Sequence, residues 1–212
     1  MIRVLIVDDH DLVRTGLKHI LSRADDVSVV GEAGSGEEAI RRQRELDPDV
    51  ILMDISMPGM SGMEVTQRML RSDDSIRIII LTAHAQSPFP TRLLEAGALG
   101  YLTKACAADE LLNAIHSVAE RRRYIGSEIA QQLALQLLPG TDQSPFEDLS
   151  SREMEVSLML TQGMSVADIA QTMSLSPKTV STYKYRIYDK LNVKNEVELT
   201  RLAMRHGLIE DD

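Results

Sequence analysis

The sequence predicts a doubly wound α/β domain at its N-terminal end and an all-α domain from residue 147 onward. Three observations support this prediction. Short apolar runs alternate with stretches of helical period over 1–121. The runs are nearly continuous, as is typical of parallel strands that are covered on both faces. No convincing strand follows Ser151.

Five strands are expected in the first domain, from apolar runs at 2–8, 27–33, 49–55, 76–83 and 100–104. Helical periodicity between them is clearest at 12–21 and 109–120. Alternation of strands and helices at this spacing indicates a parallel sheet with helices on both faces.

The remaining chain is expected to be helical and divided by a linker. Residues 124–138 are expected to form one helix, and 139–150 collect the Pro, Gly, Ser and Asp of a loop. We therefore assign 1–121 to the first domain, 122–146 to a linker that includes a helix, and 147–212 to the second domain. In the second domain we expect helices at 151–162, 165–173, 177–191 and 195–206, with Gly163 and Gly207 as C-terminal stops.

Composition narrows the class of protein. No apolar run approaches the ~20 residues of a membrane span, and no signal peptide is evident, so a cytoplasmic protein is expected. Cys106 is the single cysteine, which excludes a disulfide framework or a Cys-based zinc site. The five histidines are scattered, so a His-based metal site is not expected either.

Net charge is −9, which by itself argues against nucleic acid as a partner. The charge is unevenly distributed, however. Within 178–190, Asp189 is the single acidic residue, and the basic residues are Lys178, Lys184, Arg186 and Lys190. A small, locally basic binding surface is therefore compatible with the acidic total.

Five polar side chains are expected to meet at the carboxyl edge of the sheet, where ligands of such folds bind. They follow or end strands one, three, four and five, and are Asp8, Asp9, Asp54, Thr82 and Lys104. Adjacent carboxylates need a cation, and oxygen ligands suit a hard ion such as Mg²⁺. An ammonium and a hydroxyl can donate to phosphoryl oxygens, and Asp54 could then act as a carboxylate nucleophile.

Two other sites would use similar residues. A structural calcium site would not need Thr82 and Lys104. A phosphatase with a nucleophilic Asp after a strand would need a second Asp two residues on, where this chain has Ser56.

In combination these residues resemble a two-component receiver domain. The resemblance rests on DD at 8–9, LMD at 52–54, MPGMSG at 57–62, LTA at 81–83 and Lys104 at a strand end. It implies a flavodoxin-like (βα)5 fold, with Asp54 as the phosphoacceptor and Lys104 and Thr82 as its catalytic partners. It also implies Mg²⁺ on Asp8, Asp9, Asp54 and the backbone carbonyl of Ser56, and a switch pair of Thr82 and Tyr101.

Two points stay open. Receivers often have proline after this lysine, joined by a cis bond, but here the residue is Ala105. Tyr101 also fits a plain role as a packed core aromatic.

The stretch LSPKTVSTYKYRIYDKL, 175–191, predicts the second helix of a helix-turn-helix. Ser176 suits an N-cap, with Pro177 at the first helical position. Steps of 100° place Val180, Ile187 and Leu191 on one face. The opposite face carries Lys178, Ser181, Thr182, Tyr185 and Asp189. A helical hairpin with a solvated polar face is the plainer interpretation of the same pattern.

SPKTV followed by a basic helix and KL resembles the LuxR/FixJ-type output domain of the NarL class of response regulators. This resemblance implies DNA contacts from Lys178, Thr179, Ser181, Thr182, Lys184, Tyr185, Arg186 and Lys190. Lys184 departs from the usual pattern because it falls on the apolar face. A homodimer on DNA is expected, with Val197, Leu199 and Ala203 as candidate contacts, while Leu202 and Met204 could belong to the core.

The whole chain resembles global regulators of the GacA/UvrY type. That implies a hybrid sensor histidine kinase like BarA or GacS, promoter DNA as the target, and activation of small regulatory RNA genes. Such a regulator is not an enzyme beyond Mg²⁺-dependent self-phosphorylation and slow dephosphorylation. A receiver whose helical part acts through RNA or protein contacts is the alternative.

Overall fold

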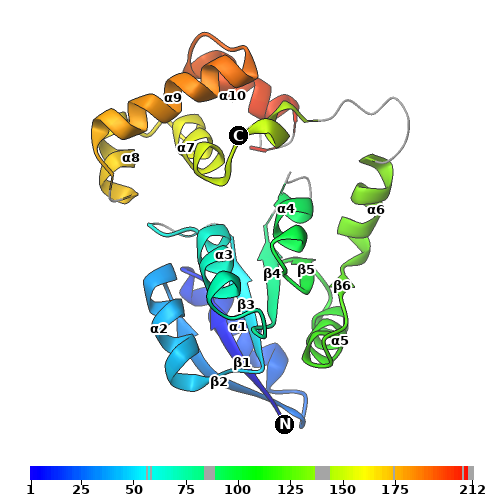
Figure 1. Ribbon diagram of the computed structural model, residues 1–212. Helices are drawn as coiled ribbons and strands as arrows, with labels where there is room; N and C mark the ends of the chain where they lie inside the picture. The colour runs from blue at the N-terminus through cyan, green and yellow to red at the C-terminus, as the bar shows by residue number, and fades with distance from the viewer. Residues whose placement is uncertain are drawn as a thin grey trace. The chain divides into compact units, whose positions relative to one another are not determined.

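The computed structural model describes residues 1–55, 57, 59–83, 89–136, 144–173, 175–206 and 208–209. The chain divides into two compact units, with the boundary near the end of one helix, between Ala134 and Leu135 (Figure 1). Across these ranges, no helix combines the length and apolar character that a membrane crossing requires.

A six-stranded parallel sheet, in the order β2-β1-β3-β4-β5-β6, forms the centre of the first unit. Its strands are β1 (Ile2–Val7), β2 (Val27–Ala33), β3 (Val50–Asp54), β4 (Ile78–Thr82), β5 (Gly100–Thr103) and β6 (Tyr124–Ile125). The five strands expected from the apolar runs are all present, each within two residues of its expected ends. The chain order reverses between β1 and β3, which is the place where doubly wound sheets bind ligands.

Helices cover both faces of this sheet, as the continuous apolar strands require. They are α1 (Asp11–Leu21), α2 (Gly36–Leu46), α3 (Gly62–Ser72), α4 (Phe89–Glu95) and α5 (Ala108–Ala119). Strand residues such as Leu52 and Leu81 pack with Leu21 and Ile115 of α1 and α5. The helices α2, α3 and α4 lie along the other face (Figure 1). This arrangement brings the carboxyl ends of the central strands together at one edge of the sheet.

The expectation of one helix over 124–138 is wrong at its start. Tyr124–Ile125 form β6, and α6 (Ser127–Gln136) begins after Gly126, while 137–138 lie outside the described residues. The amide of Gly126 donates to the carbonyl of Tyr101 at 2.9 Å, which ties this segment to β5. A Cβ at Gly126 would come within 2.9 Å of the terminal Cδ2 methyl of Leu102, so this side chain would have to shift to accommodate it.

The second unit is helical. It contains the 3₁₀ helix η1 (Pro145–Asp148) and the α-helices α7 (Ser151–Thr161), α8 (Val166–Thr172), α9 (Pro177–Leu191) and α10 (Glu196–Arg205). The four expected α-helices are thus confirmed, each beginning at a capping side chain: Ser150, Ser165, Ser176 or Asn195. Gly163 follows α7 with φ +78°, as expected of a C-terminal stop, whereas Gly207 lies outside the described residues.

Phe146 belongs to the core of the second unit although it lies in the expected linker. Its side chain is fully buried, and its ring meets that of His206 edge to face, with centroids 6.2 Å apart. The 3₁₀ helix η1 that carries it also contacts α9. Phe146 is a single apolar residue among polar and loop-forming neighbours, so no periodic pattern in the sequence indicates that it is buried.

We predict that Phe146→Ala lowers the free energy of unfolding of the second unit by about 3–5 kcal/mol, because a large buried side chain is removed. Urea denaturation followed by far-UV circular dichroism measures the loss. Asp148→Ala, at an exposed side chain of the same short helix, is the matched control and is expected to change little. Equal stability of Phe146→Ala and this control would contradict the assignment of Phe146 to the core.

Candidate functional site

Asp8 and Asp54 lie side by side at the carboxyl edge of the sheet. Asp54 ends β3, and Asp8 directly follows β1, whose Val7 pairs with Met53. Each side chain is 1% exposed. Two carboxylates that share a buried location repel each other and require a cationic partner.

Lys104 supplies part of the missing charge. It follows β5, and its Nζ lies 2.7 Å from Oδ2 of Asp8 and 2.9 Å from Oδ2 of Asp54. Burial by itself would lower the pKa of the Lys104 ammonium. The hydrogen bonds to both carboxylates outweigh burial, and the pKa is raised above its ordinary value. The ammonium is therefore charged and bridges two strand ends.

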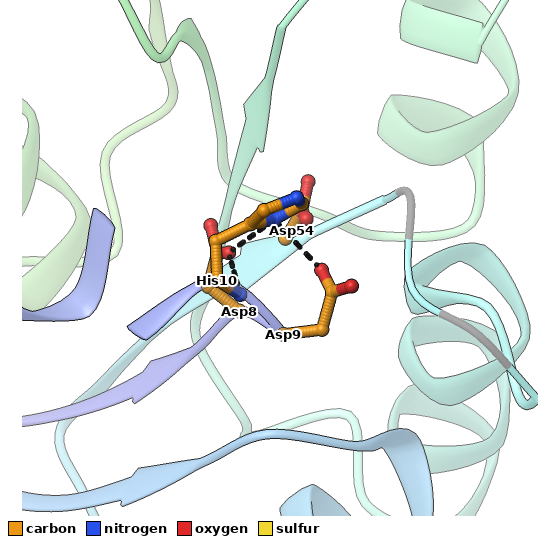
Figure 2. A group of neighbouring side chains, drawn as sticks. All are labelled: Asp8, Asp9, His10 and Asp54. Carbon is orange, nitrogen blue, oxygen red and sulfur yellow. Dashed lines mark hydrogen bonds and ion pairs between the residues drawn. The ribbon is translucent and has the colours of Figure 1, made fainter. Parts of the chain in front are cut away.

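Asp9 and His10 complete the cluster, and Figure 2 shows both side chains beside Asp8 and Asp54. The Nδ1 atom of His10 lies 3.0 Å from Oδ1 of Asp9 and 3.2 Å from Oδ1 of Asp8. The amide of His10 donates to the same Asp8 oxygen at 2.8 Å. One ligand atom from each of the four residues falls within 4.8 Å of all the others.

His10 is not among the residues expected from the sequence, where the histidines seemed too scattered for a shared site. Its position directly after two aspartates was the available signal. Three carboxylates and one imidazole nitrogen now form a group that could hold a divalent cation.

Thr82 and Tyr101 are buried near this edge. Thr82 ends β4 opposite Thr103, and its carbonyl accepts the Lys104 amide at 2.7 Å. Tyr101 pairs with Ile80 and is fully buried, so the structure shows it packed in the core. The proximity of Thr82 to Lys104 is thus observed, while a switching role for the pair stays a prediction.

The loop after Asp54 approaches the strand end closely. A Cβ at Gly62 would lie 1.7 Å from the carbonyl oxygen of Asp54, so a side chain cannot be accommodated there without moving the strand end. The Gly62 amide donates to the Ile55 carbonyl at 3.0 Å. Ser56, whose carbonyl is an expected metal ligand, lies outside the described residues. The bond from Lys104 to Ala105 is trans.

The helix-turn-helix is formed by α8 and α9. Ser176 caps α9 by accepting the Thr179 amide at 3.1 Å, as its position before Pro177 predicts. Val180, Ile187 and Leu191 are buried, which confirms the expected inner face. On the outer face Lys178, Thr182, Tyr185 and Asp189 are exposed, and Ser181 is half-buried. Tyr185 is 68% exposed and therefore free of the neighbouring helices.

Two of the lysines expected to contact DNA, Lys184 and Lys190, have partners within the second unit. The ammonium of Lys190 donates to Glu153 at 2.7 Å and to the Asp148 carbonyl at 3.0 Å. The ammonium of Lys184 donates to Glu196 at 2.5 Å. Both lysines thus have acidic partners inside the second unit. By contrast, neither Lys178 nor Arg186 forms an ion pair within the described part of the chain, and both are exposed.

The expected dimer contacts on α10 need correction. Leu199 and Ala203 are buried in the core of the unit, where α10 packs on α7. Val197 is 61% exposed, and Met204, offered from the sequence as a core residue, is 37% exposed. With Arg201 between them, these residues form one exposed face at helical spacing.

Family models match both units. A response regulator receiver domain matches 4–116, and the luxR family of bacterial regulatory proteins matches 147–203. The fold and the acidic site, joined to a luxR-type helical unit, define a two-component response regulator.

Similar proteins identify the type of response regulator. The chain is 50% identical over 211 residues to the response regulator GacA of Pseudomonas viridiflava, with 99% of each chain covered. It is also 50% identical to the response regulator UvrY of Escherichia coli K12, over 98% of this chain and 96% of the relative. The chain belongs to the family of GacA/UvrY-type response regulators, which are transcription factors.

Solved structures agree with this assignment. The response regulator RcsB from Salmonella enterica serovar Typhimurium, bound to promoter rprA with the phosphomimetic BeF3⁻, matches with a TM-score of 0.74 and 27% identity. The match covers 95% of this chain and 97% of that chain. A LuxR-family response regulator from Aurantimonas is 39% identical with a TM-score of 0.62, over 64% of this chain and 97% of that chain.

We predict that Lys190→Met lowers the free energy of unfolding by about 1–3 kcal/mol at neutral pH, because the buried Glu153 carboxylate loses its ion-pair partner and keeps the hydrogen bond from the Ser150 amide. Although burial would raise the pKa of Glu153, the hydrogen bonds from Lys190 and Ser150 hold it below its ordinary value. A depressed pKa in the folded state stabilises the protein above the unfolded pKa, and this stability is lost on acidification.

The stability difference between wild type and Lys190→Met should therefore shrink on acidification through and below the ordinary pKa range of a glutamate carboxyl, as Glu153 of the folded wild type becomes protonated. Urea denaturation across this range measures it. Lys194→Met, at an exposed lysine in the turn before α10, is the matched control. A difference that is independent of pH would contradict the ion-pair explanation.

Proposed function

We propose that this chain is controlled by phosphorylation of Asp54 and that its helical unit then binds promoter DNA as a homodimer. The observation that carries the proposal is the buried pair of Asp8 and Asp54 with Lys104 between them, on the same chain as a capped helix-turn-helix with an outward polar face. A receiver (1–121) and an output domain (147–212), with Phe146 added to the latter, are the proposed working units.

In the proposed phosphoryl transfer, an Oδ atom of Asp54 forms a bond to phosphorus while the bond to the leaving group breaks. The donor is a phosphohistidine of a sensor histidine kinase, of the hybrid BarA/GacS-like type, or a small molecule such as acetyl phosphate. Lys104 moves its hydrogen bond from Asp54 to a phosphoryl oxygen, which offsets charge in the transition state. Thr82, with Tyr101, is the proposed switch that responds to the phosphoryl group.

The residues at the site fit Mg²⁺. Three carboxylates against one ammonium leave two negative charges, which a divalent cation would balance. Asp9 and Asp54, together with Asp8, would hold it through oxygen, the ligand type that Mg²⁺ prefers. When bound, Mg²⁺ would supply positive charge beside the phosphoryl oxygens. We also propose that the chain catalyses no reaction beyond its own phosphorylation from small donors and its slow dephosphorylation.

For DNA, we propose that α9 enters the major groove with its N-terminal half. Ser181, Thr182 and Tyr185 would contact base edges, while Lys178, Thr179 and Arg186 would hold phosphates. Lys184 and Lys190 are left out because acidic residues hold their ammonium groups. The exposed face of Val197, Arg201 and Met204 is proposed as the dimer contact. Promoters of small regulatory RNA genes are the proposed targets.

The alternative is that the helical unit acts through RNA or another protein. Binding that is selective for one duplex sequence and falls with salt favours the DNA proposal. Equal affinity for unrelated duplexes would favour the alternative.

We predict that Asp54→Asn abolishes labelling by acetyl phosphate while the domain stays folded, since asparagine keeps the shape of the side chain. Incorporation of labelled phosphate and circular dichroism measure the two effects. Asp11→Asn, an exposed aspartate beside the site, is the matched control and should keep full labelling. Asp9→Ala should lose Mg²⁺ affinity and labelling together. Labelling of the Asp54→Asn protein, or full labelling in a chelator, would contradict the assignment.

We predict that Tyr185→Ala weakens binding to the operator by about 1–3 kcal/mol and binding to random DNA very little, because base contacts carry sequence information. Its melting temperature should stay near that of wild type, since the ring is exposed. The half-buried Tyr188 provides the contrast, because Tyr188→Ala should lower the melting temperature. A collapsed transition for Tyr185→Ala, or equal losses on both DNAs, would show that Tyr185 is not the base-contacting residue.

A further inference from the structure

Lys184 lies on the inner side of α9, where a charged residue is unexpected. Its side chain is 24% exposed, and Nζ donates to Oε1 of Glu196 at 2.5 Å. The same Nζ lies 5.7 Å from the centroid of the Tyr188 ring, within the range of a cation–π contact. The hydrogen bond to Glu196 raises the pKa of Lys184. The ammonium is thus bound within the protein.

Glu196 is the first residue of α10, where a negative charge also suits the helix N-terminus. Between the two helices the chain turns at Asn192, which has φ +52°, and Val193 donates to the Tyr188 carbonyl at 3.0 Å. The helix α10 itself packs chiefly on α7. The Lys184–Glu196 pair therefore links the middle of α9 directly to the start of α10.

We propose that the Lys184–Glu196 ion pair is a strut that fixes the angle between α9 and α10, and so the spacing at which two copies of the chain read two half-sites. Lys184 is then a positioning residue and not a phosphate contact. This inference rests on the proposed binding of DNA through α9 and of a second copy through the exposed face of α10. If both hold, the angle between these helices sets the distance between the two reading helices of the dimer.

The two possible roles of Lys184 predict opposite results for Glu196→Gln. If Lys184 and Glu196 form a strut, loss of the Glu196 carboxylate should weaken binding to an operator with two half-sites. If Lys184 contacts a phosphate, Glu196 competes for it, and loss of the Glu196 carboxylate should strengthen binding. Removal of one negative charge should also strengthen binding to any DNA slightly. We therefore compare the affinity for a duplex with two half-sites with the affinity for a duplex with one, and the ratio of the two discriminates between the roles.

The experiment uses the full chain treated with acetyl phosphate, and a duplex that wild type selects from a random pool. The second probe is the same duplex with one half-site scrambled. For Lys184→Met and for Glu196→Gln we expect the affinity ratio to fall about threefold to tenfold. One exposed ion pair changes an equilibrium constant by up to about fivefold, and the dimer contains two such pairs. The double variant should be no worse than either single variant, because one interaction is lost in each case.

Hydrogen exchange without DNA provides an independent readout. The amides of 192–199 should exchange faster in both single variants and at the wild-type rate in Lys184→Arg. Arg186→Gln, at an exposed residue of the same helix, is the matched control. It should weaken binding to both probes equally and leave this exchange unchanged.

Two results would overturn the proposal of a strut. One is an unchanged rate of hydrogen exchange at 192–199 in Lys184→Met. The other is a higher affinity of Glu196→Gln for both probes with the ratio of the two affinities unchanged. If wild type selects no duplex, the proposed function fails and the role in half-site spacing fails with it. The exchange measurement would still decide whether the ion pair fixes the α9–α10 angle.

Discussion

The first unit depends on one ammonium group, that of Lys104, which bridges two buried carboxylates and neutralises part of their charge. Asp8 and Asp54 end neighbouring strands and are almost completely shielded from water, so their mutual repulsion is weakly screened. Lys104 reaches both from the end of β5. This contact requires β1, β3 and β5 to end at one edge of the sheet, which a parallel sheet provides and an antiparallel arrangement does not. The apolar strands hold the three ends in place, and the carboxylates that Lys104 leaves uncompensated belong to a group that could hold a divalent cation.

Much of this arrangement could be predicted from the sequence because it depends on where strands end. Each strand is indicated by an apolar run, and the polar residue after the run lies at the carboxyl edge of a parallel sheet. The capped helices of the second unit are similarly local, since Ser176 and Pro177 define the start of α9 within a few residues. The fold class and the carboxylates of the site follow from such short-range patterns.

What could not be predicted depends on contacts between distant segments. The strand β6 has two residues and pairs with β5. Tyr and Ile favour strands, but two residues are too few to show a strand pattern beside the helical period that follows. Phe146 is one apolar residue among loop formers. Glu153 and Lys190 are separated by 37 residues, and their pairing appears when η1 and α7 approach α9. His10 is an exception, because its contacts are with its sequence neighbours Asp8 and Asp9. It was discounted because the histidines were considered only relative to one another.

The two paired lysines of α9 show why charge counted along a helix overstates a nucleic-acid surface. Four basic residues between 178 and 190 suggest a uniformly basic helix. In the folded unit, Lys184 pairs with Glu196 and Lys190 with Glu153. Lys178 and Arg186 form no ion pair within the described part of the chain and are exposed. Lys178 lies at the N-terminal end of α9, the end that enters the groove in helix-turn-helix proteins. Lys190 lies at the other end, against η1. Lys178 and Arg186 therefore lie on the same stretch of α9 as Thr182 and Tyr185. This is the stretch that we propose contacts DNA.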